Sequence, residues 1–342
     1  MQQRRVTLAD VARLAGVAPA TASRALTGHG QASAAAVERV RQAAAELGFT
    51  PNQAARALAS QRTHAIALVI PEPVSMVLGD PYLVESITGV SEAFRGTDYQ
   101  MLLVIVRPDE PPAKALRVIR QGMVDGAIVV SHHGAVLGGQ GPAAPPGTLH
   151  GVPAVYIGQP WGDPQCMFVT VDDLSAGRLA TSRLIERGAT RVACVAGSAD
   201  MVAVQGRTQG WRETLVAAGL TPGPVEYEPF TMAGGAQAME RILAAYPQVD
   251  GVFAQSDMMA LGAIGVLTKA GRKVPDDVLV ASVDNSAVAV AAAPPLTSVT
   301  NPAAALAAQA ARMLLRVLDQ DQAPTDQAPE IQQPTLVVRE SA

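Results

Sequence analysis

Apolar residues near the N-terminus repeat at the spacing of short amphipathic helices. Residues 8–15 place four apolar side chains on one helical face, at positions i, i+3, i+4 and i+7. Thr7 and Asp10 form the pattern of an N-terminal cap, and Gly16 predicts the end of this helix. Pro19 stands at the favourable first position of a second short helix. A helix, a tight glycine turn and a second helix predict a helix-turn-helix.

Two more helical segments follow. Ser33 predicts the cap of a third helix, and Gly48 predicts its end. Residues 51–58 are rich in helix formers, but a segment this short is marginal as an isolated helix. The N-terminal part is therefore expected to be small and all-α.

Beyond residue 63, short apolar runs alternate with helical stretches. Such runs are typical of buried parallel strands joined by crossover helices. Strands are expected at 65–70, 101–106, 127–130, 154–157, 192–196, 252–254 and 278–283, and helices at 84–94, 113–120, 177–186, 207–218, 237–245 and 258–268. This alternation predicts a doubly wound α/β structure. Gly- and Pro-rich stretches at 134–151, 221–224 and 320–329 predict surface loops.

The net charge of −4 hides an asymmetry between these two parts. Residues 1–62 carry eight arginines and three acids, a net charge of +5, whereas the remainder carries −9. This asymmetry indicates that the basic N-terminal part, the head, binds a polyanion and that the acidic remainder, the body, does not.

Composition excludes several classes of protein. A chain of 342 residues that is 49% hydrophobic can bury a large core in two or three domains, so disorder throughout is excluded. Asp10 interrupts the N-terminus before any apolar stretch can form, so no signal peptide is expected. The longest uncharged run, 285–311, contains three prolines and does not fit a spanning helix. Cys166 and Cys194 are too few for a disulfide framework and fit a reducing cytosol. A cytoplasmic chain with no membrane partner is expected.

Three motifs in the basic head stand in a fixed order. They are Thr7-Leu-Ala-Asp-Val-Ala-x-x-Ala-Gly-Val17, Thr21-x-Ser-Arg24 and Leu47-Gly-Phe-x-Pro-Asn52. With these motifs the head resembles the lactose-repressor (LacI/GalR) family of transcription regulators. The resemblance continues through Val124-Asp-Gly-Ala-Ile128, Arg207-x-x-Gly-Trp211, Ser256-Asp-x-Met-Ala-Leu-Gly262 and Pro295-Leu-Thr-Ser298.

This resemblance implies three domains. Residues 1–50 would form a helix-turn-helix DNA-binding headpiece, 51–62 a hinge helix and linker, and 63–342 an effector-binding and dimerisation core. The core would be a two-lobed, periplasmic-binding-protein-like structure. Its first lobe is expected at 63–162 plus 290–318 and its second at 163–289 plus 319–342, so the chain would cross between lobes three times.

The resemblance also implies how the headpiece contacts DNA. Its second helix would enter the major groove with Pro19, Ala20 and Arg24 at base-reading positions. Arg24 can fork onto guanine O6 and N7, whereas Pro19 and Ala20 offer only apolar contact. In two departures from the family pattern, Ala18 replaces a capping serine and Ala22 replaces a core valine. The expected DNA contacts are Thr7, Pro19, Ala20, Thr21, Ser23, Arg24, Asn52, Arg56 and Leu58, with Leu58 wedged between base pairs of the minor groove.

An effector site is implied between the lobes, at the carboxyl ends of strands. Arg207 would donate to sugar hydroxyls and Asp284 would accept from them, while an aromatic ring would stack on the ligand. The expected effector-binding residues are Tyr82, Ser131, His132, Arg207, Phe230, Ser256, Asp284 and Asn301. Ser256 stands where asparagine is usual in the family. The alternatives are an Arg207 that pairs with an acid in a structural bridge, an Asp284 that serves a turn, and Phe230 and Tyr82 as core aromatics.

The sequence lacks the motifs of common enzymes. It has no Gly-x4-Gly-Lys-Ser/Thr phosphate loop, no Gly-x-Ser-x-Gly elbow and no His-Glu-x-x-His pair. No third ligand is spaced to join the adjacent histidines 132 and 133, so neither a metal nor a cofactor is expected. The function expected is that of an allosteric regulator, a repressor, which binds a pseudo-palindromic operator as a dimer and responds to a sugar or sugar derivative.

Three alternatives remain open at the level of sequence. The same DNA-binding role could depend on a phosphocarrier protein or a purine-type corepressor. The chain could instead be a sugar-metabolising enzyme fused to a DNA-binding head, which turnover of a sugar would reveal. An architectural DNA protein would bind without sequence preference and would leave the two-lobed body unexplained.

Overall fold

The computed structural model describes residues 6–27, 32–49, 62–107, 111–131, 133, 147–161, 166–320 and 328–342. The chain divides into two compact units, Met1–Thr63 and His64–Ala342. Each unit has its own buried apolar core.

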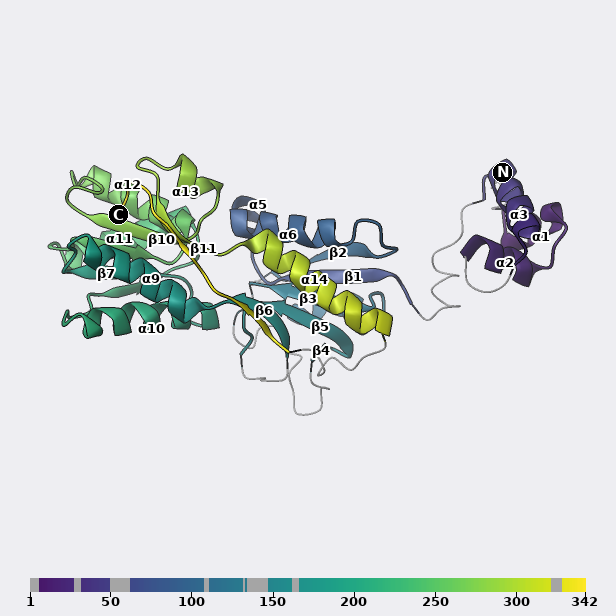
Figure 1. The fold of residues 1–342 in the computed structure, drawn as a ribbon, viewed down its shortest axis with the longest axis horizontal. Coiled ribbons are helices and arrows are strands. Elements are labelled where there is room, and N and C mark those ends of the chain that lie inside the picture. Colours follow the sequence, from purple (N-terminus) through teal and green to yellow (C-terminus); the bar gives the residue numbers. More distant parts are fainter. Residues whose placement is uncertain are drawn as a thin grey trace. The chain divides into compact units, whose positions relative to one another are not determined.

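The N-terminal unit contains the three helices predicted for the headpiece, α1 (Leu8–Ala15), α2 (Pro19–Thr27) and α3 (Ala34–Glu46) (Figure 1). The Oγ1 atom of Thr7 accepts from the backbone N–H of Asp10, and the Asp10 carboxylate accepts from the backbone N–H of Thr7. Gly16 ends α1 with a φ of 65°, a conformation that glycine adopts without steric cost. Ala22 is fully buried among the three helices, so alanine fills the core position where the family has valine.

The first lobe of the larger unit is built on one sheet. Its strands run in the order β12-β6-β5-β3-β1-β2 and are all parallel, with β4 added antiparallel to β5. The strands are β1 (Ala65–Ile70), β2 (Gln100–Ile105), β3 (Gly126–Val130), β4 (Thr148–Leu149), β5 (Val152–Ile157), β6 (Met167–Val171) and β12 (Glu330–Gln332). The helices are α5 (Val74–Gly79), α6 (Pro81–Ala93), α7 (Pro112–Ala115), α8 (Arg117–Arg120) and α14 (Ala303–Gln320).

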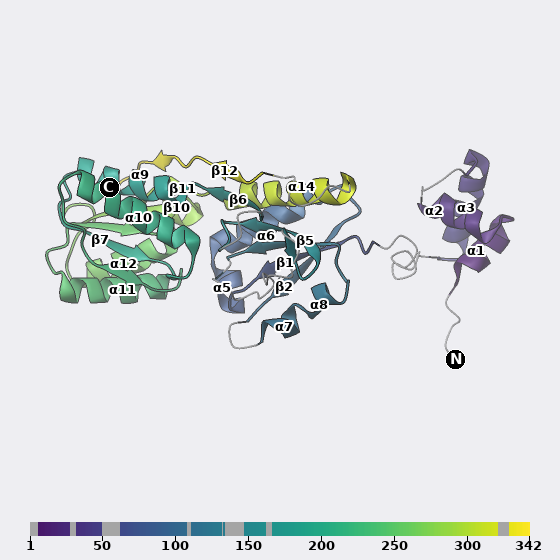
Figure 2. The same cartoon turned by 90° about the horizontal axis from the view of Figure 1, so that it is seen from below.

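Helices cover both faces of this sheet, which explains why its central strands are apolar throughout. In β1, Ile66 and Leu68 belong to the core beneath α6 and α14, while Ala67 and Val69 belong to the core on the other face. Figure 2 shows α14 on one side of the strands and α7 and α8 on the opposite side. Successive side chains of a strand point to opposite faces, so a strand covered on both sides becomes a continuous apolar run.

The second lobe repeats this plan. Its sheet has the order β13-β11-β10-β9-β7-β8, parallel except for β13. The strands are β7 (Val192–Ala196), β8 (Val225–Tyr227), β9 (Gly251–Ala254), β10 (Leu279–Asp284), β11 (Thr297–Thr300) and β13 (Leu336–Val337). The helices are α9 (Asp173–Glu186), α10 (Val202–Ala217), α11 (Met232–Ala245), α12 (Asp257–Lys269) and α13 (Ala287–Ala291).

The chain crosses between the two sheets later than the sequence suggested. The first lobe was expected to end at residue 162, but β6 belongs to the first sheet, where it pairs in parallel with β5 and β12. β11 belongs to the second sheet although a return at residue 290 was expected. β12 likewise joins the first sheet, beyond the expected crossing at 318. The crossings therefore lie between β6 and α9, between β11 and α14, and between β12 and β13.

Other elements also differ from expectation. The structure divides the helix expected at 113–120 into α7 and α8. It also adds elements that were not expected, namely the strands β4, β6, β8, β11, β12 and β13 and the helices α5, α13 and α14. Helices α9 and α10 begin four and five residues before the predicted starts at 177 and 207. Within the described part of the chain, no helix has the length and apolar character needed to cross a membrane.

Two glycines of α12 give a direct test of this packing. A Cβ atom on Gly262 would lie 2.0 Å from the backbone oxygen of Met232 in α11, whereas a Cβ on Gly265 would meet nothing within 4 Å. Gly262→Ala should therefore lower the free energy of unfolding by roughly 1–3 kcal/mol, as overpacking does. Gly265→Ala should raise it by about 0.5–1 kcal/mol, because alanine favours the helix. Urea unfolding of both variants tests this, and equal effects would contradict the close helix contact.

Candidate effector cleft and DNA-reading helix

Residues from both lobes line one cavity at the carboxyl ends of strands, the place where α/β proteins commonly bind small molecules. Seven of the eight effector residues expected from the sequence line it, and His132 lies outside the described residues. The seven are Tyr82, Ser131, Arg207, Phe230, Ser256, Asp284 and Asn301.

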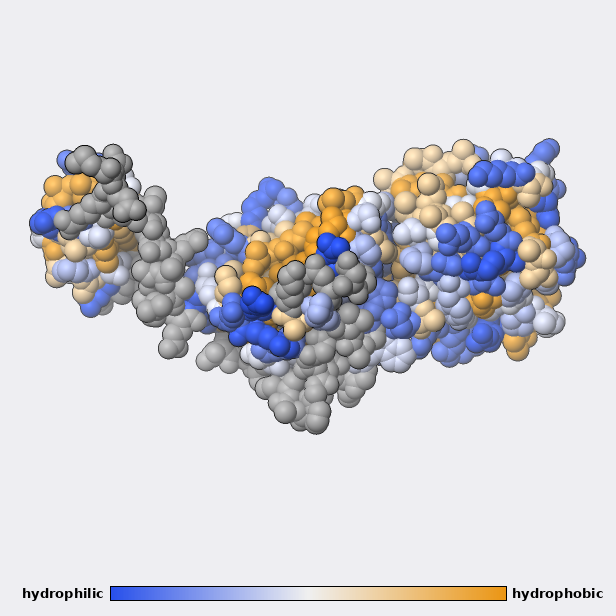
Figure 3. Space-filling model, turned by 180° about the vertical axis from the view of Figure 1, so that it is seen from behind, coloured by the Kyte–Doolittle hydropathy of each residue, from blue (hydrophilic) through white to orange (hydrophobic). Residues whose placement is uncertain are grey.

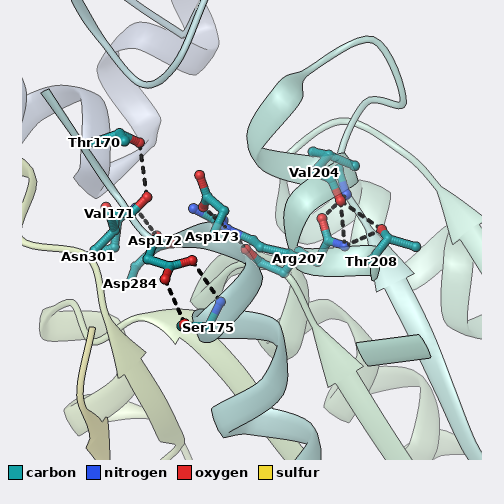
Figure 4. Close-up of polar contacts among 12 residues, drawn as sticks. Thr170, Val171, Asp172, Asp173, Ser175, Val204, Arg207, Thr208, Asp284 and Asn301 are labelled. Carbon is teal, nitrogen blue, oxygen red and sulfur yellow. Dashed lines mark hydrogen bonds and ion pairs between the residues drawn. The ribbon is translucent and has the colours of Figure 1, made fainter. Parts of the chain in front are cut away.

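Arg207 is the most constrained charge in this cavity. It is 6% exposed, its Nε atom lies 2.8 Å from Oδ1 of Asp173, and its Nη1 donates to the backbone oxygen of Gln255 at 2.8 Å (Figure 4). Burial would lower the pKa of Arg207, but Asp173 and Asp284 outweigh burial and raise it. Arg207 thus forms a structural ion pair and part of the cavity wall at the same time, in a fixed, charged state.

Asp284 and Asn301 form the acceptor side of the cavity. Asp284 ends β10 with a φ of 112°, and its Oδ1 accepts from Nδ2 of Asn301 at 3.1 Å. Burial, together with nearby Asp257, raises the pKa of Asp284 well above its usual value. The Oδ1 atom of Asn301 is buried without a hydrogen-bond partner among the described residues. An orphaned buried acceptor and a strained backbone are both features that a bound ligand explains.

The wall from the first lobe begins at the N-terminus of α6. Asp80 caps this helix, accepting from the backbone N–H of Tyr82 at 2.9 Å, with Pro81 at the first helical position. Burial raises the pKa of Asp80 to about 6. Burial also raises the pKa of Tyr82, so its phenol remains a hydrogen-bond donor at neutral pH. Asp80 was not predicted as a residue of the site. A proline directly after an aspartate is, however, a sequence pattern typical of a helix N-terminus.

The remaining residues have local structural roles as well. Oγ of Ser256 accepts from the backbone N–H of Met259 and caps α12, which leaves less hydrogen-bonding capacity for a ligand. Oγ of Ser131 donates to Oε1 of Glu72 at 2.5 Å. The ring of Phe230 lies over Gly197, where a Cβ atom would stand 2.2 Å from its Cζ. Phe230 therefore packs on the lobe with one part of its ring and lines the cavity with another.

The charge of the cavity limits its ligands. Among the described lining residues the acids are Asp80, Asp173 and Asp284, and the one cation is Arg207, which is already paired. A phosphate or carboxylate would find no unpaired cation among these lining residues, whereas hydroxyl groups can hydrogen-bond to the carboxyl groups and accept from Arg207. The described residues contain no group of three side chains suited to hold a metal ion.

In the headpiece, α2 presents the predicted base-reading residues to solvent. Pro19, Ala20 and Arg24 are exposed, and Thr21 and Ser23 are partly exposed. The Thr7 hydroxyl donates to the Asp10 carboxylate at 2.7 Å, so it also holds the start of α1. The expected contacts Asn52, Arg56 and Leu58 lie outside the described residues.

Comparison with known proteins agrees with both units. Residues 7–52 match the family described as bacterial regulatory proteins, lacI family, and residues 181–342 match the periplasmic binding protein-like domain. The chain is 40% identical to the HTH-type transcriptional regulator CelR of Thermobifida fusca, over 92% of each chain. The protein belongs to the lacI family. This membership confirms the family predicted from the headpiece motifs.

Two solved structures share the fold of this lacI-family chain. A CelR–cellobiose complex is 37% identical, with a TM-score of 0.76 over 99% of this chain and 100% of that one. A lac repressor dimer bound to operator and an anti-inducer has a TM-score of 0.84 over 99% of both chains, at 23% identity. Together with the family match, these relatives confirm a DNA-binding transcriptional regulator with a two-lobed α/β core, rather than an enzyme.

The raised pKa of Asp80 predicts a pH-dependent stability. An acid whose pKa is higher in the folded state favours folding at pH values below its unfolded pKa, and this contribution is lost as pH rises through about 6. Asp80→Asn keeps a capping oxygen but no charge, so at about pH 7 it should be more stable than the parent by roughly 1–3 kcal/mol. The difference should vanish near pH 3.

Urea unfolding across this pH range measures the effect. Asp98→Asn, which removes the charge of an exposed acid in the same lobe, is the matched control. A constant offset for Asp80→Asn at all pH values would show that Asp80 does not titrate in this way.

Proposed function

We propose that this regulator is a repressor that binds a pseudo-palindromic operator as a dimer and is controlled by a neutral sugar held between its lobes. The observation that carries the effector assignment is the polar wall of the cavity: a paired Arg207 beside Asp284 and the orphaned acceptor of Asn301. Alternating donors and acceptors of this kind match vicinal hydroxyl groups.

Three features favour a neutral disaccharide over other effectors. Among the described lining residues no unpaired cation is present to bind a sugar phosphate or a sugar acid. Tyr82 and Phe230 supply aromatic surface that a pyranose ring can cover. The related CelR, 37% identical in its structure, was solved with cellobiose. Cellobiose is therefore the effector we propose, ahead of a purine or a phosphocarrier protein.

Control of DNA binding follows from the two lobes. The cavity is lined from both sides, by Tyr82 and Ser131 of the first lobe and by Arg207 and Asp284 of the second. A sugar that contacts both walls binds one arrangement of the lobes better than another and shifts the population toward it. Sugar binding thereby changes the affinity of the protein for its operator. By thermodynamic linkage, operator binding changes the affinity for the sugar by the same factor.

An apolar surface on the first lobe supports the dimer. Leu78 of α5 is 72% exposed, and β2, the edge strand of its sheet, exposes Leu102 on one face and Leu103 on the other. Figure 3 shows an orange, apolar band across the first lobe. Contiguous apolar surface beside an edge strand is typical of an interface, and a second copy gives it a self-complementary partner.

The proposed DNA contacts are those inferred from the headpiece motifs. Arg24 would read guanine, Thr21 and Ser23 would hold phosphates, and the hinge at 51–62 would supply Asn52, Arg56 and Leu58 in the minor groove. Since its target is chromosomal DNA, we propose that the protein acts in the cytoplasm.

Arg24→Ala tests base reading in the headpiece. Loss of the guanine contact should weaken operator binding by about 1–3 kcal/mol and relax the preference at one base pair of each half-site. Arg41→Ala removes the same charge from an exposed position of α3 and is the control. Selection from a random DNA pool, followed by titration, compares the two. Unchanged base preference in Arg24→Ala would remove Arg24 from the readout.

A thermal-shift screen tests the effector. At 100 times its dissociation constant, cellobiose should add roughly 2.7 kcal/mol to the free energy of unfolding. Gluconate and glucose 6-phosphate should add nothing, because the cavity disfavours anions. Asn301→Ala should abolish the shift, whereas Gln209→Ala, at an exposed position of α10, should keep it. A shift with the anions but not with cellobiose would overturn the neutral-sugar assignment.

A further inference from the structure

A contact between the lobes lies outside the cavity described above. His133 follows β3 in the first lobe and lies between two acids. Its Nε2 is 2.9 Å from Oε1 of Glu72, and its Nδ1 is 3.1 Å from Oδ1 of Asp200. Glu72 follows β1 of the first lobe, whereas Asp200 follows β7 of the second. The histidine therefore connects the two lobes through a charge-assisted contact.

Asp200 is held by the first lobe a second time. The Nε1 atom of Trp161, which follows β5, donates to the backbone oxygen of Asp200. His133 and Asp200 also line an outer cavity that shares Met76, Asp80 and Phe230 with the inner one. The loop carrying Asp200 is thus fixed at the cleft by a side-chain contact and a main-chain contact.

This connection continues into the inner cavity. Oε1 of Glu72 accepts from Oγ of Ser131 as well as contacting His133, and Ser131 lines the inner cavity. Ser131 has a φ of 56°, a left-handed conformation that non-glycine residues seldom adopt. Hydrogen-bonded contacts therefore run from the cavity wall through Glu72 and His133 to the opposite lobe.

We propose that Glu72, His133 and Asp200 form a cross-lobe clasp that stabilises the closed arrangement of the lobes and thereby strengthens effector binding. The clasp needs no contact with the ligand, because its members bind one another. The choice of ligand for one of the tests below rests on the proposed function, but the clasp itself rests on the contacts between the lobes.

The charge of His133 decides how strong the clasp is. A neutral imidazole can donate from one nitrogen only, so contacts from both nitrogens to carboxylates require the charged ring. The hydrogen bond to Glu72, opposed by burial and helped by Asp200, raises the pKa of His133 to about 9. Asp80, the further acid of the outer cavity, has a pKa of about 6 and stays charged when His133 loses its proton.

This pKa predicts the direction of a pH effect. Opening the lobes removes Asp200 from His133 and leaves Glu72, so the pKa of His133 is higher in the closed state than in the open one. Protonation therefore favours closure. The stabilisation is complete below the open-state pKa and is lost as pH rises through about 9.

Tryptophan quenching tests the clasp without any ligand. The chain has two tryptophans, and Trp211 is fully buried, so acrylamide quenching reports on Trp161. His133→Gln and Asp200→Asn should increase quenching at neutral pH, and the parent should reach the same level well above pH 9. Arg178→Gln is the control, because Arg178 pairs with Glu213 inside the second lobe. Equal quenching in the parent and both clasp variants would overturn the proposal.

Calorimetric titration with cellobiose then measures the consequence. His133→Gln should bind cellobiose about tenfold more weakly at neutral pH, within the usual range of coupling between sites. Affinity of the parent should fall as pH rises through about 9, while that of His133→Gln stays level. Parent-like affinity and pH dependence in His133→Gln would overturn the clasp. If cellobiose does not bind the parent, the proposed effector fails, and the quenching result alone decides the clasp.

Discussion

The buried guanidinium of Arg207 is the constraint on which the effector cleft depends. A charge removed from water must be paired and hydrogen-bonded, and Arg207 meets this requirement through Asp173 and the backbone oxygen of Gln255. These partners come together because α9 and α10 approach each other closely at two glycines. A Cβ on Gly177 would lie 2.1 Å from the backbone oxygen of Arg207, and one on Gly210 the same distance from that of Leu174. Two glycines thus bring the helices close enough for the ion pair.

The same geometry explains why a small molecule can control the protein. The cavity receives strand ends from both sheets and also Val171 and Asn301, which lie where the chain crosses between lobes. A ligand there contacts two bodies and the segments that join them. Its binding energy can therefore bias the relative position of the lobes directly. A pathway of contacts through the core is not needed.

Much of the fold could be predicted from the sequence because both sheets are covered on both faces. The runs that became β1 and β7 were predicted with the observed bounds, since buried parallel strands are apolar throughout. The short strands β6, β11 and β12 were not predicted, and for this reason the expected lobe boundaries were wrong. Asp173 was also missed as a partner of Arg207: the two are 34 residues apart, and only the packing of α9 on α10 brings them together.

A crystal structure of the protein grown with saturating cellobiose would test the central claim most directly. We expect the disaccharide between the lobes, with hydroxyl groups within hydrogen-bond distance of Arg207, Asp284 and Oδ1 of Asn301, and with a ring against Tyr82 or Phe230. An empty cleft, or a sugar bound elsewhere on the molecule, would contradict it.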